Sequence, residues 1–251
     1  MNMLLRSCYC LGATSALLVP LAHGFQCAPL MRSSRIQKMR TSSVVLHHSD
    51  GDSVSAGFDY SSKAEWDNFY ETGQGGFEWH SALSLETIAS YIPEHSKCLM
   101  VGSGDSGLPA VTLTTRENVQ VTLLDNSKVC MDQMEELYGD AVKCQCGDAT
   151  KLTNYFDQGE GAAFDIIVDK GLTDALLCSE GWDFYVEQLL QGSSKILKSG
   201  SGKYLLITYR LPKSHQEFLQ EIGDRSDVGL KWDFNLDHST EKISISMANK
   251  V

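Results

Sequence analysis

The first 49 residues contain no aspartate or glutamate, although the whole chain of 251 residues has 32 acidic residues. The same stretch carries five basic residues, Arg6, Arg32, Arg35, Lys38 and Arg40. A segment that has arginine and serine but no acids is typical of an organellar targeting peptide. We therefore interpret residues 1–49 as a presequence and residues 50–59 as a linker, and we predict one folded domain over residues 60–251.

The presequence has no apolar run long enough to span a bilayer comfortably, because its apolar stretch covers only residues 11–22. Small residues follow at Ala22 and Gly24, as at a signal-peptide cleavage site. Phe25 comes next, and this junction resembles the signal-then-transit junction of plastid precursors in diatoms and related algae. The pattern favours a plastid, with a mitochondrial presequence or a secretory signal as alternatives.

The predicted domain is poor in basic residues. Removing the presequence leaves 16 basic against 32 acidic residues, a net charge near −16. A body of this charge repels nucleic acid and anionic membrane, so we predict neither as a partner. The same charge would attract a basic acceptor surface, although an acidic balance also serves solubility.

The domain also lacks a second cysteine pair to accompany Cys144 and Cys146 at metal-binding spacing. Zinc is therefore improbable, and we predict no metal site. We find no internal repeat, low-complexity run or transmembrane helix in residues 60–251.

Apolar runs and helical patterns alternate along the domain. We predict strands at residues 98–101, 119–124, 142–146, 164–168, 203–209, 231–236 and 243–247. We predict helices at residues 60–70, 83–92, 108–116, 128–138, 182–197 and 214–222. This alternation favours an α/β fold with a doubly wound, Rossmann-like, seven-stranded sheet in three α/β/α layers. The last two strands are joined by only six residues, so they must form a hairpin with an antiparallel last strand.

A glycine-rich turn follows the first predicted strand, and an acid closes the second. Gly102, Gly104 and Gly107 form the turn, and Asp125 comes 21 residues after Gly104. Glycines allow a backbone to approach a ligand closely, and an acid at this distance accepts the ribose hydroxyls of a nucleoside. The pattern predicts a nucleoside-containing cofactor without choosing which one.

The spacing of the three glycines matches the dinucleotide fingerprint, so a nicotinamide-dependent reductase is one alternative. A dinucleotide fold usually continues into a further substrate domain, whereas this chain ends after one sheet with a reversed hairpin. That architecture is typical of S-adenosylmethionine-dependent methyltransferases. A further acid, Asp148, follows the third strand, where such enzymes contact adenine. Asp125 and Asp148 could instead cap the helices that follow them.

The run FDIIVDKGLTDAL at residues 164–176 resembles one group of methyltransferases. These are the seven-strand protein-lysine methyltransferases that modify translation elongation factor 1-alpha and citrate synthase, whose corresponding run has Thr-Leu where this chain has Leu172-Thr173. The elements WDNFY at 66–70, FEW at 77–79 and GSGDS at 102–106 extend the resemblance, which covers roughly residues 60–210.

The resemblance implies a role for each matched residue. Trp66, Tyr70 and Trp79 would close over S-adenosylmethionine, although their spacing alone also suits an amphipathic helix packed on the sheet. The remaining cofactor-binding residues would be Gly102, Gly104, Asp125 and Asn126 at the methionine and ribose portions, Asp148 and Ala149 at adenine, and Lys170. Lys170 could otherwise form a solvated ion pair with Asp169.

Methyl transfer is a direct displacement, so no protein nucleophile is expected and we assign no catalytic residue. Asp169 and Asp174 are assigned to positioning the acceptor. The favoured substrate is a protein with an accessible lysine. A small-molecule methyltransferase, a reductase and a non-catalytic module on the same scaffold stay as alternatives.

Overall fold

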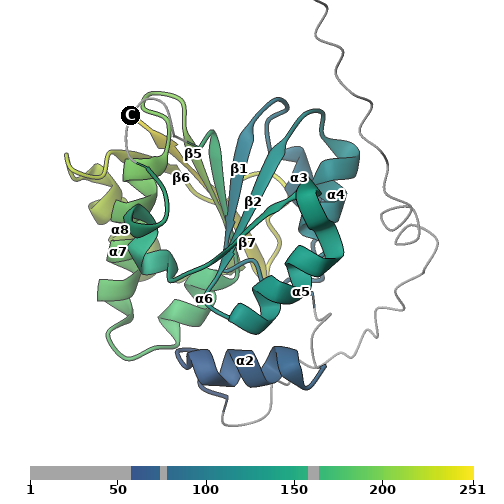
Figure 1. Ribbon diagram of the computed structural model, residues 1–251. Helices are drawn as coiled ribbons and strands as arrows, with labels where there is room; N and C mark the ends of the chain where they lie inside the picture. Colours follow the sequence, from purple (N-terminus) through teal and green to yellow (C-terminus); the bar gives the residue numbers. More distant parts are fainter. Residues whose placement is uncertain (1–57, 74–77, 158–163) are drawn as a thin grey trace, which may run out of the picture. The chain divides into compact units, whose positions relative to one another are not determined.

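The computed structural model describes residues 58–73, 78–157 and 164–251. The predicted presequence and most of the predicted linker lie outside these residues. The described chain forms a seven-stranded sheet in the order β3-β2-β1-β4-β5-β7-β6, with helices on both faces (Figure 1). The predicted three-layer α/β fold is therefore confirmed.

The first five strands run parallel to one another. They are β1 (Lys97–Val101), β2 (Gln120–Asp125), β3 (Lys143–Cys146), β4 (Ile166–Lys170) and β5 (Lys203–Tyr209). The strands β6 (Leu230–Asp233) and β7 (Ile243–Lys250) form an antiparallel pair, and β7 also runs antiparallel to β5. The predicted closing hairpin with its reversed last strand is confirmed.

The two faces of the sheet have separate apolar cores, because successive side chains of a strand point to opposite faces. In β1, Cys98 and Met100 belong to one core and Leu99 and Val101 to the other. The first core is covered by α2 (Lys63–Glu71), α3 (Leu85–Ser90), α4 (Leu108–Thr115) and α5 (Lys128–Tyr138). The second is covered by α7 (Trp182–Ile196), α8 (Lys213–Asp224) and the 3₁₀ segment η2 (Ala149–Asn154).

Serine side chains begin three of these helices. Ser62, Ser84 and Ser127 each accept a hydrogen bond from a backbone N–H in the first turn of α2, α3 and α5. Such caps satisfy amide groups that have no partner within the helix.

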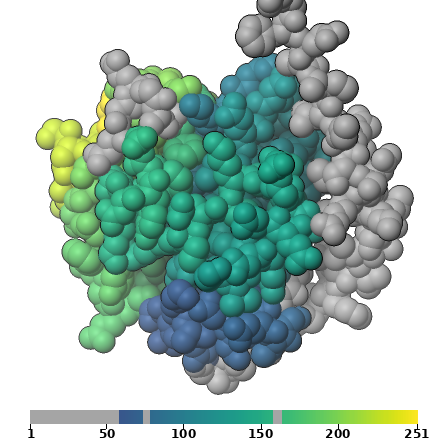
Figure 2. Space-filling model, viewed as in Figure 1, coloured from purple at the N-terminus to yellow at the C-terminus, as the bar shows by residue number. Residues whose placement is uncertain are grey.

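In the space-filling view, α2 (dark blue) runs along the lower edge of the molecule (Figure 2).

Several local predictions differ from the structure; for example, the sixth strand ends at Asp233 rather than residue 236, and α2 begins at Lys63 rather than residue 60. The fourth strand begins at Ile166 rather than Phe164, because Phe164 forms only an isolated bridge with Leu197. A short helix that was not predicted, α6 (Leu172–Leu177), follows β4 directly, and the 3₁₀ segment η1 (Gly139–Ala141) extends α5. Among the described residues, no helix has the length and apolar character that a membrane crossing requires.

Candidate functional site

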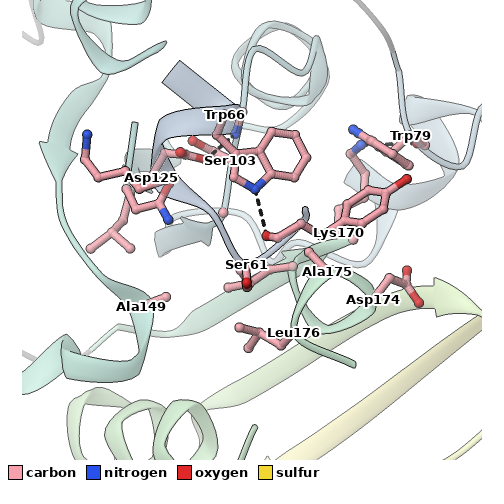
Figure 3. A pocket seen from close by; sticks show the side chains of 18 of the residues that line it. Ser61, Trp66, Trp79, Ser103, Asp125, Ala149, Lys170, Asp174, Ala175 and Leu176 are labelled. Carbon is pink, nitrogen blue, oxygen red and sulfur yellow. Dashed lines mark hydrogen bonds between the residues drawn. The ribbon is translucent and has the colours of Figure 1, made fainter. Parts of the chain in front are cut away.

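A cavity of about 560 Å³ lies beyond the carboxyl ends of the parallel strands. Its walls come from the segments that follow β1, β2, β3 and β4, from the end of β5, and from the chain around α2. The strands β1 and β4 are neighbours at the point where the strand order reverses, which is where open α/β sheets bind ligands. Figure 3 shows Asp125 and Ala149 on one side of this cavity and Lys170 and Asp174 on the other.

The glycine turn needs its glycines because of the protein's own packing. Gly102 and Gly104 have φ angles of 55° and 51°, which side chains rarely adopt. A Cβ on Gly102 would lie 2.7 Å from the Cβ of Leu172, and one on Gly104 would lie 2.8 Å from the hydroxyl of Tyr70. The turn thus brings bare backbone against residues of the cavity wall.

Asp125 joins the glycine turn to the end of β2. Its Oδ2 accepts the backbone N–H of Gly104 at 3.0 Å, and its Oδ1 accepts that of Ser127 at 2.9 Å. Burial raises the pKa of Asp125, and the two backbone donors oppose that rise. Ser127 is the residue that caps α5, so the alternative that Asp125 is simply the helix cap is wrong. Asn126, next in the chain, also lines the cavity.

Asp148, by contrast, does cap the segment that follows it. Its Oδ1 accepts the backbone N–H and the hydroxyl of Thr150, at 2.9 and 2.7 Å, and Lys151 lies 2.9 Å from Oδ2. Burial raises the pKa of Asp148, but these donors outweigh burial and hold the pKa below its ordinary value. Asp148 and Ala149 also line the cavity. Asp148 is therefore both a cap of the segment after β3 and a residue of the cavity wall, the two possibilities that the sequence offered.

Trp66, Tyr70 and Trp79 form an aromatic wall of the cavity. The rings of Trp66 and Tyr70 stack with centroids 6.2 Å apart, and Trp79 meets Trp66 edge to face at 6.4 Å. The Trp66 indole N–H donates to the Tyr60 carbonyl at 2.9 Å (Figure 3). Tyr70 is buried, and burial raises its pKa far above the usual range. Core packing and contact with the cavity are therefore combined in one helix.

Two side-chain hydrogen bonds from α5 hold α2, one of them from the Gln133 amide to the Tyr70 carbonyl at 3.3 Å. The Ser127 hydroxyl, at the start of α5, donates to the Asp67 carboxylate at 2.6 Å. Asp67 in turn pairs with Lys63 at 2.5 Å. The aromatic wall is thus anchored at the end of β2, next to Asp125.

Lys170 does not pair with Asp169, as one interpretation of the sequence suggested. Its ammonium lies 2.5 Å from Oε1 of Glu78 and donates to the Trp79 carbonyl at 3.2 Å. Both side chains of this ion pair are nearly buried, with 7% and 11% exposure. Glu78 also accepts the Ser106 hydroxyl and the Gly107 N–H, both at 2.9 Å, so the pair links β4, the segment before α3 and the glycine turn.

Asp169 points away from the cavity into the second core. It is fully buried and accepts hydrogen bonds from the N–H and hydroxyl of Thr173 and from the Tyr204 hydroxyl. Burial raises its pKa to about 6, although these hydrogen bonds oppose the rise. Asp169 is not among the residues that line the cavity, so the structure does not support its assignment to acceptor positioning. Successive side chains of a strand point to opposite faces of the sheet, so Asp169 faces away from the side to which Lys170 points.

Asp174 lines the cavity and is held from two directions. Its Oδ2 lies 2.9 Å from Nε2 of His80, and its carboxylate accepts the backbone N–H of Tyr209 at 3.2 Å. The His80 ring is fully buried and lies 4.8 Å from the Tyr209 ring. This arrangement fixes one carboxylate at the cavity wall, next to Tyr209, whose side chain also lines the cavity.

The cavity brings together all the predicted site residues except Asp169: Trp66, Tyr70, Trp79, Gly102, Gly104, Asp125, Asn126, Asp148, Ala149, Lys170 and Asp174. Glu78 and His80 were not assigned a role from the sequence. They flank Trp79 in the sequence, but that position does not identify their partners, Lys170 and Asp174.

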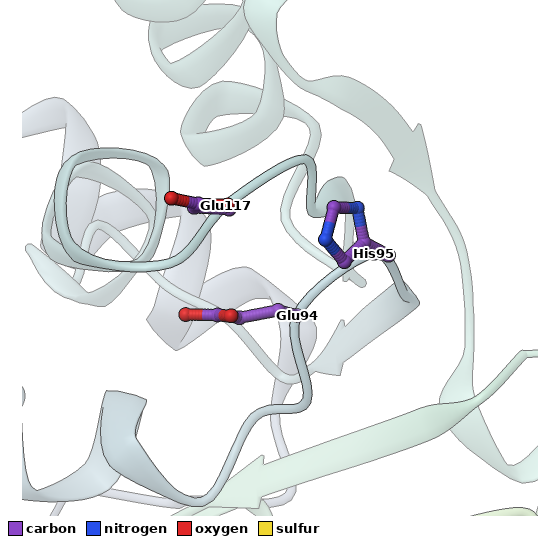
Figure 4. A group of neighbouring side chains, drawn as sticks. All are labelled: Glu94, His95 and Glu117. Carbon is purple, nitrogen blue, oxygen red and sulfur yellow. The ribbon is translucent and has the colours of Figure 1, made fainter.

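A second group of polar side chains lies away from this cavity, at the amino ends of β1 and β2. Glu94, His95 and Glu117 each place one possible metal-ligand atom within 4.8 Å of the others (Figure 4). All three are exposed, and the Arg116 guanidinium lies 3.7 Å from Glu94. We assign no role to this surface cluster.

No family model matches the chain. The chain is, however, 31% identical over 191 residues to the mitochondrial citrate synthase-lysine N-methyltransferase of zebrafish (Danio rerio), covering 66% of this chain and 74% of that relative. It belongs to the same methyltransferase family. The methyltransferase is also 29% identical over 158 residues to the mouse (Mus musculus) eEF1A lysine and N-terminal methyltransferase, and it spans 22% of that longer protein.

Solved structures show the same fold. A TehB-like S-adenosylmethionine-dependent methyltransferase from Corynebacterium glutamicum superposes with a TM-score of 0.53 at 16% identity, over 76% of this chain and all of that one. Human N-acetylserotonin methyltransferase in complex with S-adenosylmethionine gives a TM-score of 0.51 at 15% identity, over 76% of this chain and 57% of that one. The methyltransferase prediction and its cofactor, S-adenosylmethionine, are confirmed.

The residues of the cavity fit this cofactor. The nearly buried carboxylate of Asp125 suits a ribose, and the backbone of Gly104, which donates to that carboxylate, lines the cavity next to it. A volume of about 560 Å³ is in the usual range for cofactor pockets.

Proposed function

We propose that this methyltransferase transfers a methyl group to the side-chain amine of a lysine in a protein. The observation that carries the proposal is Asp174, a carboxylate on the cavity wall opposite Asp125 that His80 and the backbone N–H of Tyr209 hold in place. The relatives named above are lysine methyltransferases, which supports the same substrate class.

In this proposal the cofactor lies along the strand ends. Asp125 and Asn126 hold the ribose, Asp148 and Ala149 the adenine, and the glycine turn the methionine part. The aromatic wall of Trp66, Tyr70 and Trp79 excludes water from it. When bound, S-adenosylmethionine supplies an electrophilic methyl group, so the protein needs no nucleophile of its own.

The acceptor lysine enters at the end of the cavity where Asp174 lies. Its amine must be unprotonated to react, while its reference pKa is about 10.4. Burial between aromatic rings disfavours the charged form and lowers that pKa. Asp174 alone would favour the charged form, so its role is to position the amine. His80 and the Tyr209 N–H hold the carboxylate in one orientation for this task.

We also propose that the enzyme works in an organelle, after removal of residues 1–49 from the domain that begins near residue 60. The acid-free presequence supports an organelle, and Phe25 at its junction favours a plastid. The zebrafish relative carries "mitochondrial" in its name, which supports the alternative compartment. A fluorescent fusion of residues 1–60 imaged in cells decides between the two.

The function is tested in two steps with the purified domain. Calorimetric titration with S-adenosylhomocysteine, and with reduced nicotinamide cofactors as controls, measures cofactor choice. Incubation with tritiated S-adenosylmethionine and organelle extract, followed by mass spectrometry, identifies the product. A protein labelled at a lysine supports the proposal. A labelled metabolite, or no label despite cofactor binding, refutes it in favour of a small-molecule enzyme or a non-catalytic module.

A further inference from the structure

Two of the most exposed large apolar side chains, Phe184 and Tyr185, lie together beside the cavity, and a third, Tyr209, lines it. Phe184 is 58% exposed, Tyr185 39% and Tyr209 36%, and among the described residues the only other large apolar side chain in this class is the terminal Val251. Tyr185 and Tyr209 line the cavity, and the Phe184 ring lies 5.7 Å from that of Tyr185. Aromatic side chains that stay exposed together mark sites of interaction.

The chain segment that carries Phe184 and Tyr185 is acidic, whereas an exposed base, Arg210, follows Tyr209. Residues 171–194 contain Asp174, Glu180, Asp183 and Glu187 but no lysine, arginine or histidine. Glu187 is paired with Arg225 and Asp174 with His80. Glu180 and Asp183 are exposed on either side of the turn that begins α7, and no basic side chain among the described residues pairs with them.

We propose that Glu180, Asp183, Phe184, Tyr185 and Tyr209 form a docking surface for a basic segment of the protein substrate that flanks the acceptor lysine. This proposal rests on the proposed function. Two exposed carboxylates beside exposed aromatic rings complement a segment that has cationic side chains with apolar stems. Tyr209 belongs both to this docking surface and to the cavity and its N–H holds Asp174, so a segment that contacts Tyr209 brings its lysine toward Asp174.

A small-molecule acceptor does not account for this surface. Phe184, Glu180 and Asp183 are outside the cavity lining, so an acceptor held within the cavity would not contact them. A partner that extends beyond the cavity does contact them, and a polypeptide has that length.

The test uses two fluorescein-labelled 15-residue peptides, each with one central lysine, flanked in one by arginine and leucine and in the other by glutamate and leucine. Their binding to the full chain is measured by fluorescence anisotropy with saturating S-adenosylhomocysteine. We expect the basic peptide to bind at least tenfold more tightly than the acidic one. We expect the double variant Glu180→Lys/Asp183→Lys to bind the basic peptide at least tenfold more weakly and with a smaller salt dependence. We expect Phe184→Ser to bind that peptide several-fold more weakly.

The matched control is Glu135→Lys/Asp140→Lys, a charge reversal of the same size at two exposed positions near the end of α5. We expect wild-type peptide affinity from this control, and wild-type binding of S-adenosylhomocysteine from every variant. Equal binding of the two peptides, or an equal effect of the control and the docking-surface variants, overturns the proposal. A dimer in solution that Phe184→Ser dissociates also overturns it, because the aromatic rings would then be an interface between copies.

Failure of the docking surface and failure of the proposed function give different results. If the wild-type enzyme methylates a lysine in extract protein and the docking-surface variants do so at the same rate, only the docking surface is refuted. If the wild-type enzyme methylates no protein, the proposed function is refuted and the docking surface with it.

Discussion

Asp125 is the residue on which the cofactor assignment depends most directly. Both ribose hydroxyls would donate hydrogen bonds to the charged Asp125 carboxylate. Losing these two bonds should reduce the binding free energy by about 1–3 kcal/mol net. We therefore expect Asp125→Ala to weaken S-adenosylhomocysteine binding by about 5- to 150-fold. The structure adds a complication, because Asp125 also accepts the backbone N–H groups of Gly104 and Ser127.

This double role means that loss of affinity alone does not prove contact with the ribose. Without the carboxylate, the Gly104 N–H loses its acceptor and the glycine turn can shift. A second ligand separates the two effects. An analogue of S-adenosylhomocysteine that lacks the ribose hydroxyls should bind the wild-type enzyme about 1–3 kcal/mol more weakly than the parent ligand, since the analogue lacks those hydrogen bonds. Asp125→Ala should bind the two ligands equally, because the acceptor is gone.

Isothermal titration of both ligands against both proteins gives the coupling energy, and thermal unfolding shows that the variant is folded. Asp132→Ala is the matched control, because Asp132 is an exposed acid paired with Lys128. Its affinity for both ligands should equal that of the wild-type enzyme. A folded Asp125→Ala protein that still prefers the ligand with ribose hydroxyls by the wild-type factor would falsify the ribose assignment.

Three further predictions concern the aromatic wall, the buried ion pair and the buried acid. Trp79→Ala should weaken cofactor binding and leave urea unfolding near wild type; global unfolding would show that Trp79 is a core residue instead. Glu78→Gln should lower the unfolding free energy by about 3 kcal/mol, since it leaves the Lys170 charge buried without its partner. Adding Lys170→Met to that variant should recover part of the loss. If the double variant instead loses the sum of the two single losses, the two side chains are not coupled and the prediction is wrong. Burial raises the pKa of Asp169 to about 6 from a reference of 3.8, so the native state binds this proton more tightly than the unfolded chain. The stability that this bound proton contributes is complete below roughly pH 4 and is lost as the pH rises through about 6. The Asp169→Asn variant cannot lose it, so its unfolding free energy relative to wild type should rise by about 2–3 kcal/mol from pH 4 to pH 7. Parallel pH profiles of the two proteins would exclude a raised pKa at Asp169.

The fold was predictable because its signals are local and repeated. The apolar runs around Met100, Leu123 and Ile167 mark three parallel strands whose both faces are buried, and the short connection before Ile243 permits only a hairpin. The start of α6 was missed because it follows β4 with only Gly171 between them, a left-handed residue with φ of 90°. One glycine is too short a signal to separate a strand from a helix.

The site was predictable where a residue's role depends on its place at a strand end. Asp125 is the last residue of β2 and Asp148 follows the end of β3 by two residues, so the topology alone brings them to one edge of the sheet. The partners of Lys170 and Asp174 could not be predicted, because Glu78 and His80 come from a segment about 90 residues earlier. Nothing in a single sequence states which distant side chains meet. Asp169 was misassigned because the DKG run was treated as one unit, while alternation along β4 sends Asp169 and Lys170 to opposite sides.

The ion pair of Lys170 and Glu78 changes how the cofactor's carboxylate can be held. An ammonium has three donors, and Lys170 already uses one on Glu78 and one on the Trp79 carbonyl. One donor is left for a ligand, and the neighbouring glutamate cancels the lysine's charge. Lys170 therefore contributes orientation more than net attraction, and the Glu78 carboxylate holds the Gly107 end of the glycine turn through its N–H. Glu78 and Asp125 anchor the two ends of the turn, so the N–H groups of Gly107 and Gly104 already donate within the protein.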